Sequence, residues 1–285
     1  MTNKSFFFGV HMVSYRHKAM QTIAMIGMAM IMTFGASADE ALVKHCQIND
    51  DLNSVEKGPY THETMSLDFG VSVHFPAEID ASNCLHGVVS FGNGSGRYGG
   101  NNYDKFFESL AEYGFVVVVN HSGNTGSGLP LISALDVLYE KAQEEDHPFH
   151  KRLQQIAGVA GQSQGGLGAS AATRDERVVA AVPMAGAGNV EKPTLFITSQ
   201  ADYMSGGVRA AYGRSNQMSI FVSLRGTGHA GIPFHDRAIS LATSWYRCHL
   251  NQNKSVCETF LPECLQCKSS DVADQSQKSE KGFTD

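Results

Sequence analysis

The sequence has little tryptophan, little positive charge and little low-complexity sequence. It contains one Trp and 22 Lys+Arg among 285 residues, and its 28 Asp+Glu give a net charge of −6. A nucleic-acid binder gains affinity by neutralising phosphates, so this charge and the scattered basic residues exclude that class. The six Cys are too few for a small disulfide scaffold. No collagenous or heptad repeat dominates, and 42% hydrophobic residues can bury a core, which excludes a wholly disordered chain.

Acidic side chains are absent from the first 38 residues. Three basic residues there are followed by an apolar stretch over 20–34 and by the small residues Ala-Ser-Ala at 36–38. These are the three parts of a secretory signal peptide. The stretch is shorter than the ~20 residues that cross a bilayer, so we expect cleavage after Ala38 rather than a permanent anchor. The mature chain then has 19 Lys+Arg against 28 Asp+Glu, a net charge of −9, and no integral membrane span.

The cysteines all lie in the mature part, at Cys46, Cys84, Cys248, Cys257, Cys264 and Cys267. We expect a secreted or periplasmic protein, where disulfides form, and six thiols allow 15 full pairings. The CxxC at 264–267 also fits zinc or redox chemistry, but a second pair is missing, which favours structural bridges. The segments are a signal peptide over 1–38, a catalytic domain over 39–264 and a polar tail over 265–285, which we expect to be disordered.

Strand-like and helix-like segments alternate through the mature chain. A hairpin is expected over 63–75, strands over 86–91, 115–119, 156–160, 178–184, 193–198 and 219–224, and helices over 103–113, 131–142, 165–173, 208–212 and 236–250. Continuous apolar runs such as 115–119 are typical of strands buried on both faces of a parallel sheet. The alternation predicts an α/β fold with a mostly parallel central sheet and helices on both faces.

A GxSxG motif, Gly161-Gln162-Ser163-Gln164-Gly165, stands between a buried strand and a helix rich in glycine and alanine. This strand–turn–helix setting is the one that a nucleophile elbow requires. The flanking glycines leave room for the tight turn, and the N-terminus of the helix favours the negative charge that develops during reaction. A glycine-rich turn with an inert serine is the alternative, and the setting makes it the weaker one.

A serine nucleophile needs a base, and the base needs an orienting acid. Asp202 follows the strand 193–198, and His229 follows the strand 219–224, so both fall at the same sheet edge as Ser163 and in the order Ser, acid, His. His235 and Asp236 are nearby rivals that we expect to cap the closing helix. His121 also ends a strand but precedes the serine.

The oxyanion requires two main-chain donors, for which we predict the N–H groups of Asn93 and Gln164. The alternative for this early loop is a dinucleotide site, because residues 94–99 fit GxGxxG. That fingerprint needs an acidic residue at the end of the next strand, which ends here in Asn120-His121, so the dinucleotide interpretation is the weaker one.

The order SFGNG, GFVVVVNH, GQSQGG, PTLFITSQAD, GTGHAG resembles the secreted dienelactone-hydrolase-like branch of the α/β-hydrolases, which includes the bacterial polyesterase–lipase–cutinases. The resemblance covers about residues 60–260 and implies an α/β-hydrolase fold without a large cap domain. It implies ester hydrolysis through Ser163, Asp202 and His229, with no metal and no cofactor. Polyester hydrolases carry an aromatic residue where Asn93 stands and a Trp after the strand 178–184, and both are missing here.

We therefore expect a secreted serine hydrolase of carboxylic esters, small or aliphatic, as free molecules or at a polymer surface, acting as a monomer. An acyltransferase with the same triad and a non-catalytic binding protein with this fold are the alternatives. Met184, Tyr203 and Met204 could line an acyl pocket or serve ordinary packing.

Overall fold

The computed structural model describes residues 45–46, 58–96, 103–261 and 263–278, so the predicted signal peptide lies outside the described residues. The strands in the described part are β1 (His62–Leu67), β2 (Val71–Pro76), β3 (His86–Gly92), β4 (Val116–Asn120), β5 (Leu153–Gln162), β6 (Val178–Met184), β7 (Thr194–Ala201), β8 (Ser219–Gly228) and β9 (Val272–Lys278). The α-helices there are α1 (Asp104–Glu112), α2 (Leu129–Lys141), α3 (Gln164–Ala172), α4 (Ser205–Arg214), α5 (Asp236–His249) and α6 (Lys254–Glu258).

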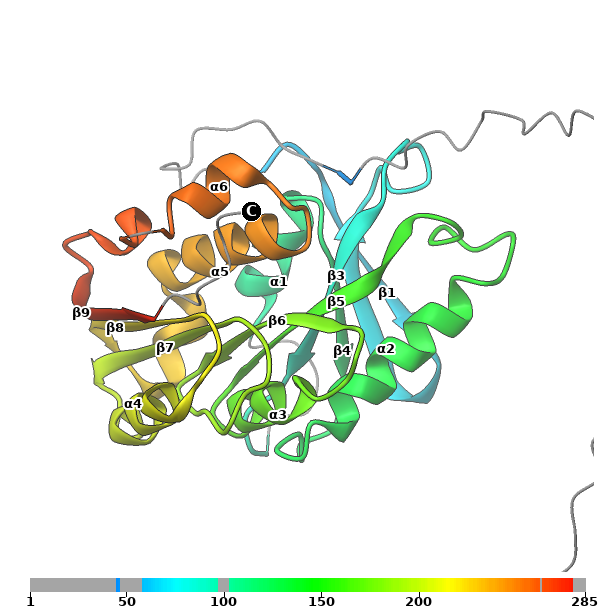
Figure 1. Cartoon of the computed structure of the whole chain (residues 1–285). Coiled ribbons are helices and arrows are strands. Elements are labelled where there is room, and N and C mark those ends of the chain that lie inside the picture. Colours follow the sequence, from blue (N-terminus) through cyan, green and yellow to red (C-terminus); the bar gives the residue numbers. More distant parts are fainter. Residues whose placement is uncertain (1–44, 47–57, 97–102, 262, 279–285) are drawn as a thin grey trace, which may run out of the picture. The chain divides into compact units, whose positions relative to one another are not determined.

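The strands form one mixed, mostly parallel sheet in the order β1-β2-β4-β3-β5-β6-β7-β8-β9 (Figure 1). The strands from β4 to β8 in that order pair in parallel, while β2 pairs antiparallel with β4, β1 with β2, and β9 with β8. The carboxyl ends of β3, β5, β7 and β8 therefore lie at one edge of the sheet, which we call the carboxyl edge.

Helices cover both faces of this sheet, as the alternating side chains of its strands require. In β3, Val89 packs in the cluster that contains α1 and α5, whereas its neighbour Val88 packs in the cluster that contains α2. Helices α3 and α4 contribute to further clusters with the sheet, and Figure 1 shows both on the opposite side of the sheet from α5. The predicted α/β class with a mostly parallel sheet is confirmed.

The predicted elements between the hairpin and the closing helix are all present, with shifted ends. The apolar run predicted as a doubly buried strand is β4, in which Val116–Val119 have no exposed surface. The predicted hairpin is β1 and β2, joined by a turn at Asp68–Gly70. Strands β7 and β8 continue past their apolar segments to Ala201 and Gly228, because main-chain pairing does not depend on apolar side chains.

The prediction of a disordered tail over 265–285 is wrong for its described part. Leu265–Cys267 form a 3₁₀ turn, and β9 pairs antiparallel with β8 from Ser219↔Lys278 to Leu224↔Val272. The β9 sequence, VADQSQK, is polar because a strand at a sheet edge is held by main-chain hydrogen bonds and can leave its side chains in solvent. Residues 279–285 lie outside the described residues.

Disulfides join all six cysteines, as Cys46–Cys84, Cys248–Cys257 and Cys264–Cys267. Two of these bridges hold the chain after α5, in agreement with the structural role predicted for that segment. Three disulfides are compatible with an exported protein. In the described part of the chain, none of the helices combines the length and the apolar character that a membrane crossing needs.

Candidate active site

Ser163 is the single residue between β5, which ends at Gln162, and α3, which begins at Gln164. Its backbone has φ 58° and ψ −116°, a conformation that non-glycine residues rarely adopt and that costs about 1–3 kcal/mol. The main-chain N–H of Ser163 donates to the carbonyl oxygen of Met184 at 2.8 Å, which ties the turn to the end of β6. Such strain persists only where the surrounding structure enforces it, which marks this turn as a candidate functional position.

The glycines around Ser163 are required by close main-chain contacts. A Cβ on Gly161 would lie 2.2 Å from the carbonyl oxygen of Gly165, and a Cβ on Gly165 would lie 1.9 Å from that of Gly92. A Cβ on Gly186, which follows β6, would lie 2.3 Å from the carbonyl oxygen of Ser163. The prediction that side chains beside the serine would clash is confirmed.

The structure brings the three predicted triad residues into one hydrogen-bonded chain. His229 Nε2 lies 2.9 Å from Ser163 Oγ, and His229 Nδ1 lies 2.7 Å from Asp202 Oδ1. Asp202 follows β7 and His229 follows β8, so the three meet at the carboxyl edge from three separate strands. The Asp202 side chain has no exposed surface, whereas that of His229 is 15% exposed.

Both oxygens of the Asp202 carboxylate have further donors. Thr198 Oγ1 donates to Oδ2 at 2.7 Å, and the main-chain N–H of Met204 donates to Oδ1 at 2.9 Å. A buried carboxylate held in this way stays oriented toward the imidazole. Because Oδ1 can only accept, His229 carries its proton on Nδ1, and the lone pair of Nε2 faces the Ser163 hydroxyl.

Of the two predicted oxyanion donors, Asn93 directly follows β3, and Gln164 is the first residue of α3 and directly follows Ser163. In the described part of the chain, the main-chain N–H groups of Asn93 and Gln164 donate to no other protein group. The Asn93 side chain is buried and directed toward the end of β4, where Nδ2 donates to the carbonyl oxygen of Asn120 at 2.8 Å. Two free N–H groups at these positions can bind a developing oxyanion.

Thr125 joins the two segments that carry these donors, the loop after β3 and the start of α3. Its hydroxyl donates to the carbonyl oxygen of Asn93 at 2.6 Å, and its main-chain N–H donates to Gln164 Oε1 at 3.1 Å. Thr198 and Thr125 both support the site, and sequence reasoning missed both. Thr125 stands in none of the quoted motifs, and Thr198 lies in PTLFITSQAD only as a strand residue, so their tertiary contacts identify both.

The nearby rivals of the triad have other partners. The His235 side chain caps α5 by accepting from the main-chain N–H of Arg237 at 3.2 Å, as predicted. Asp236 forms an ion pair with Lys105 on α1 at 2.6 Å. The main-chain N–H of His121 donates to the carbonyl oxygen of Gly70 at 2.9 Å, at the turn between β1 and β2.

The three residues named as candidate pocket residues differ in exposure. Met184 is completely buried in the core cluster, so it serves packing. Tyr203 is 80% exposed, and its ring centroid lies 4.3 Å from that of His229 with the planes 30° apart. Tyr203 therefore covers the imidazole from the solvent side, and its exposure excludes a packing role in the core. Met204, which is half-buried, has the Asp202 contact given above.

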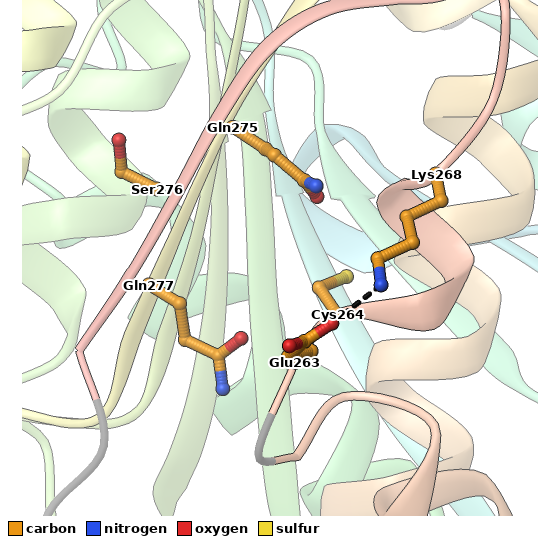
Figure 2. Close-up of a pocket in the computed structure, with 6 residues that line it drawn as sticks. All are labelled: Glu263, Cys264, Lys268, Gln275, Ser276 and Gln277. Carbon is orange, nitrogen blue, oxygen red and sulfur yellow. Dashed lines mark hydrogen bonds and ion pairs between the residues drawn. The ribbon is translucent and has the colours of Figure 1, made fainter.

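Two other features lie away from these residues. A hollow of about 220 Å³ is lined by Glu263, Cys264, Lys268, Gln275, Ser276 and Gln277. Figure 2 shows these side chains and the ion pair between Lys268 and Glu263. Cys46, Cys84 and His86 also cluster, but the two sulfur atoms are bonded to each other. The His86 ring nitrogens lie 2.9 Å from Ser82 Oγ and 2.8 Å from the carbonyl oxygen of Gly114, so both already have partners.

Comparison with models of known protein families and with curated proteins finds no match to this chain.

Proposed function

We propose that this protein is a serine hydrolase that cleaves carboxylic esters through Ser163, His229 and Asp202. The observation that carries the proposal is the chain of hydrogen bonds from Asp202 through His229 to Ser163, with the serine on a strained strand-to-helix turn. A serine without a catalytic role requires neither a strained backbone nor a histidine partner that is itself hydrogen-bonded to a buried carboxylate. The combination is the arrangement of an activated nucleophile.

The reaction follows from the geometry. His229 Nε2 takes the Ser163 proton as Oγ attacks the ester carbonyl carbon, and Asp202 stabilises the imidazolium that forms. The carbonyl oxygen becomes an oxyanion, which accepts hydrogen bonds from the N–H groups of Asn93 and Gln164. The tetrahedral intermediate then expels the alcohol, which receives its proton from His229. A water molecule, deprotonated by His229, attacks the acyl-enzyme, and the acid leaves with Ser163 restored.

The proposal extends to the α/β-hydrolase fold without a large cap domain and to export from the cell. The strand–turn–helix around Ser163, the chain order Ser, Asp, His and the placement of all three at one sheet edge support the fold. The three disulfides support export. The substrate class we propose is small or aliphatic esters, because the aromatic side chains that would hold an aromatic polyester are missing at Asn93 and after β6.

The test is hydrolysis of p-nitrophenyl esters of increasing acyl length, together with labelling by a fluorophosphonate. We expect Ser163→Ala to lower kcat by about 10⁴- to 10⁶-fold and to abolish labelling. The control is Ser109→Ala on α1, which removes a hydroxyl that donates to the carbonyl oxygen of Lys105 and leaves the turn at Ser163 unchanged. Turnover by Ser163→Ala at the rate of the unchanged protein would refute the proposal.

Product analysis with a competing alcohol separates hydrolysis from acyl transfer. Release of free acid at an undiminished rate supports a hydrolase, whereas a new ester as the main product supports an acyltransferase that uses the same residues. A protein that is neither labelled nor active on any ester of the panel would favour a binding role.

A further inference from the structure

Three hydrogen bonds run in series behind the candidate active site. The main-chain N–H of Gly94 donates to Tyr103 Oη at 3.0 Å, Tyr103 Oη donates to Gln162 Oε1 at 3.1 Å, and Gln162 Nε2 donates to the carbonyl oxygen of His229 at 3.2 Å. We propose that Tyr103 and Gln162 are positioning residues that fix the oxyanion loop relative to the catalytic histidine. This inference rests on the proposed function.

The series joins three parts of the site that are distant in sequence. Gly94 directly follows Asn93, the proposed oxyanion donor; Gln162 directly precedes Ser163; and His229 is the proposed base. Tyr103 stands at the start of α1, at the far end of the segment that leaves Gly94. One tyrosine and one glutamine therefore connect the donor, the nucleophile and the base.

The direction of each hydrogen bond is fixed at both ends of the series. Gly94 N–H can only donate and His229 C=O can only accept, so the tyrosine hydroxyl and the carboxamide between them must each accept once and donate once. A carboxamide does this at Gln162, whereas a carboxylate there would place an acceptor against the His229 carbonyl oxygen. The Gln162 side chain is therefore specified by chemistry as well as by shape.

Burial makes these hydrogen bonds costly to break. Tyr103 is 3% exposed and Gln162 is 6% exposed, so water cannot freely replace a lost partner. The space is also filled, since a Cβ on Gly94 would lie 2.4 Å from Gln162 Oε1. The Tyr103 ring packs against Phe91 and stacks on Phe234, with ring centroids 4.8 Å and 6.0 Å away. Aromatic packing therefore holds the hydroxyl in place.

The catalytic consequence concerns the transition state rather than substrate binding. Oxyanion donors must lie within about 0.5 Å of the productive position, and a displacement of ~1 Å costs about 10²-fold in rate. Loss of the series frees the loop that carries Asn93, while the surface that meets the uncharged ester stays the same. We expect kcat to fall and KM to stay nearly constant.

The test is Tyr103→Phe, which removes the hydroxyl and keeps the ring. We expect kcat on a short p-nitrophenyl ester to fall about 10- to 100-fold, KM to change less than twofold, and the rate of fluorophosphonate labelling to fall with kcat. The matched control is Tyr139→Phe, which removes the hydroxyl of a half-buried tyrosine that donates to the carbonyl oxygens of Gln154 and Ile156 at the start of β5. It should leave kcat and labelling unchanged.

A second variant and a measurement without substrate complete the test. Gln162→Met removes both hydrogen bonds of the carboxamide at similar side-chain volume. The double variant Tyr103→Phe/Gln162→Met should lose no more activity than the worse single variant, because the series is already broken.

Amide hydrogen exchange should be faster in the peptide that contains Gly94 for Tyr103→Phe, but not for Tyr139→Phe. An unchanged kcat in Tyr103→Phe, or a loss that appears only in KM, overturns the positioning role. If the protein without substitutions neither hydrolyses the esters nor is labelled, the proposed function is overturned, and with it the catalytic role of Tyr103 and Gln162. The amide hydrogen exchange of the Gly94 peptide then still decides whether these hydrogen bonds hold the loop.

Discussion

The turn at Ser163 and the C-terminal region, residues 248–261 and 263–278, are held in place in different ways. The turn is built from small residues whose main chains approach so closely that a Cβ on Gly165 would lie 1.9 Å from a carbonyl oxygen. The C-terminal region has two disulfides, a five-residue helix and a polar edge strand, and it buries Leu250, Val256 and Phe260 in the core. The turn leaves no room for a larger residue, whereas the C-terminal region is fixed by covalent bonds, main-chain pairing and a few buried side chains.

The comparison separates a region whose geometry lowers the stability of the fold, the turn at Ser163, from a region whose bonds raise it, the C-terminal region. A strained residue such as Ser163 reduces the stability of the fold, so it persists because neighbouring elements enforce it. A disulfide such as Cys248–Cys257 stabilises the fold without requiring particular side chains around it. Substitutions at the turn should therefore change activity, fold or both, whereas substitutions in the C-terminal region should change stability alone.

Among substitutions that keep Ser163, the largest effect is expected for Asp202→Asn, at the acid end of the hydrogen-bonded chain. Asparagine carries no negative charge, so it cannot stabilise the imidazolium that forms on His229 as Ser163 loses its proton. We expect kcat on a p-nitrophenyl ester to fall about 10⁴-fold, with the thermal midpoint changed by only a few degrees. Activity within tenfold of the unchanged protein would show that Asp202 does not orient the base.

The next effect compares two glycine substitutions. Gly165→Ala pushes a Cβ into the Gly92 carbonyl oxygen and should lower the free energy of unfolding by about 3 kcal/mol. Gly206→Ala on α4 is the control, because a Cβ there meets nothing within 4 Å and alanine favours a helix by about 0.5–1 kcal/mol. Chemical denaturation measures both. Equal stability of the two variants would contradict the close contact at the turn.

Acid pH should destabilise the fold through histidines outside the site. Burial lowers the pKa of His249, in the C-terminal region, to about 4, and burial with the nearby charges of His62 and His121 lowers that of His74 to about 4. The unfolded chain binds these protons near pH 6.5, before the folded chain does, so the free energy of unfolding falls as the pH drops from about 6.5 to 4. Each histidine contributes up to about 3 kcal/mol of this loss.

His249→Phe tests this contribution and keeps a ring beside Trp245. We expect the unfolding free energy, measured between pH 7 and 4, to decline less steeply than in the unchanged protein, with kcat at pH 7 the same. A decline of unchanged slope would place the acid sensitivity elsewhere.

The smallest effect is expected from opening a disulfide in the C-terminal region. The paired change Cys248→Ser/Cys257→Ser releases a loop with a sequence separation of 9, which should lower the unfolding free energy by about 2.5 kcal/mol. Activity per folded molecule at 25 °C should not change, because the bridge lies outside the hydrogen bonds of the site. If kcat falls with stability, the two regions are coupled, and the contrast between them fails.

The local features of the fold could be predicted because they depend on neighbours in the sequence. The apolar run of β4, the strand–turn–helix at Ser163 and the polar positions after β7 and β8 each appear within a short segment. Parallel strands place their carboxyl ends at one edge, so the meeting of Ser163, Asp202 and His229 followed from order along the chain. The capping role of His235 was equally local.

The missed features depend on contacts between distant segments. Strand β9 has almost no apolar pattern, because its pairing with β8 uses main-chain groups that every residue carries. Thr125 and Tyr103 act through hydrogen bonds to residues 32 and 59 positions away, and nothing in their own neighbourhoods marks them. The choice among 15 disulfide pairings likewise required the distances that the fold creates.

The sequence by itself determined the α/β class, the position of the turn and the identity of the three residues that meet there. Hydrophobic periodicity is visible within short segments, and the order of strands and helices is visible along the chain without knowledge of their packing. The tertiary structure alone decided the disulfide partners, the edge strand β9 and the links among Gly94, Tyr103, Gln162 and His229. Hydrogen bonds act over about 3 Å, so which groups pair depends on which distant segments the packed sheet and helices bring together.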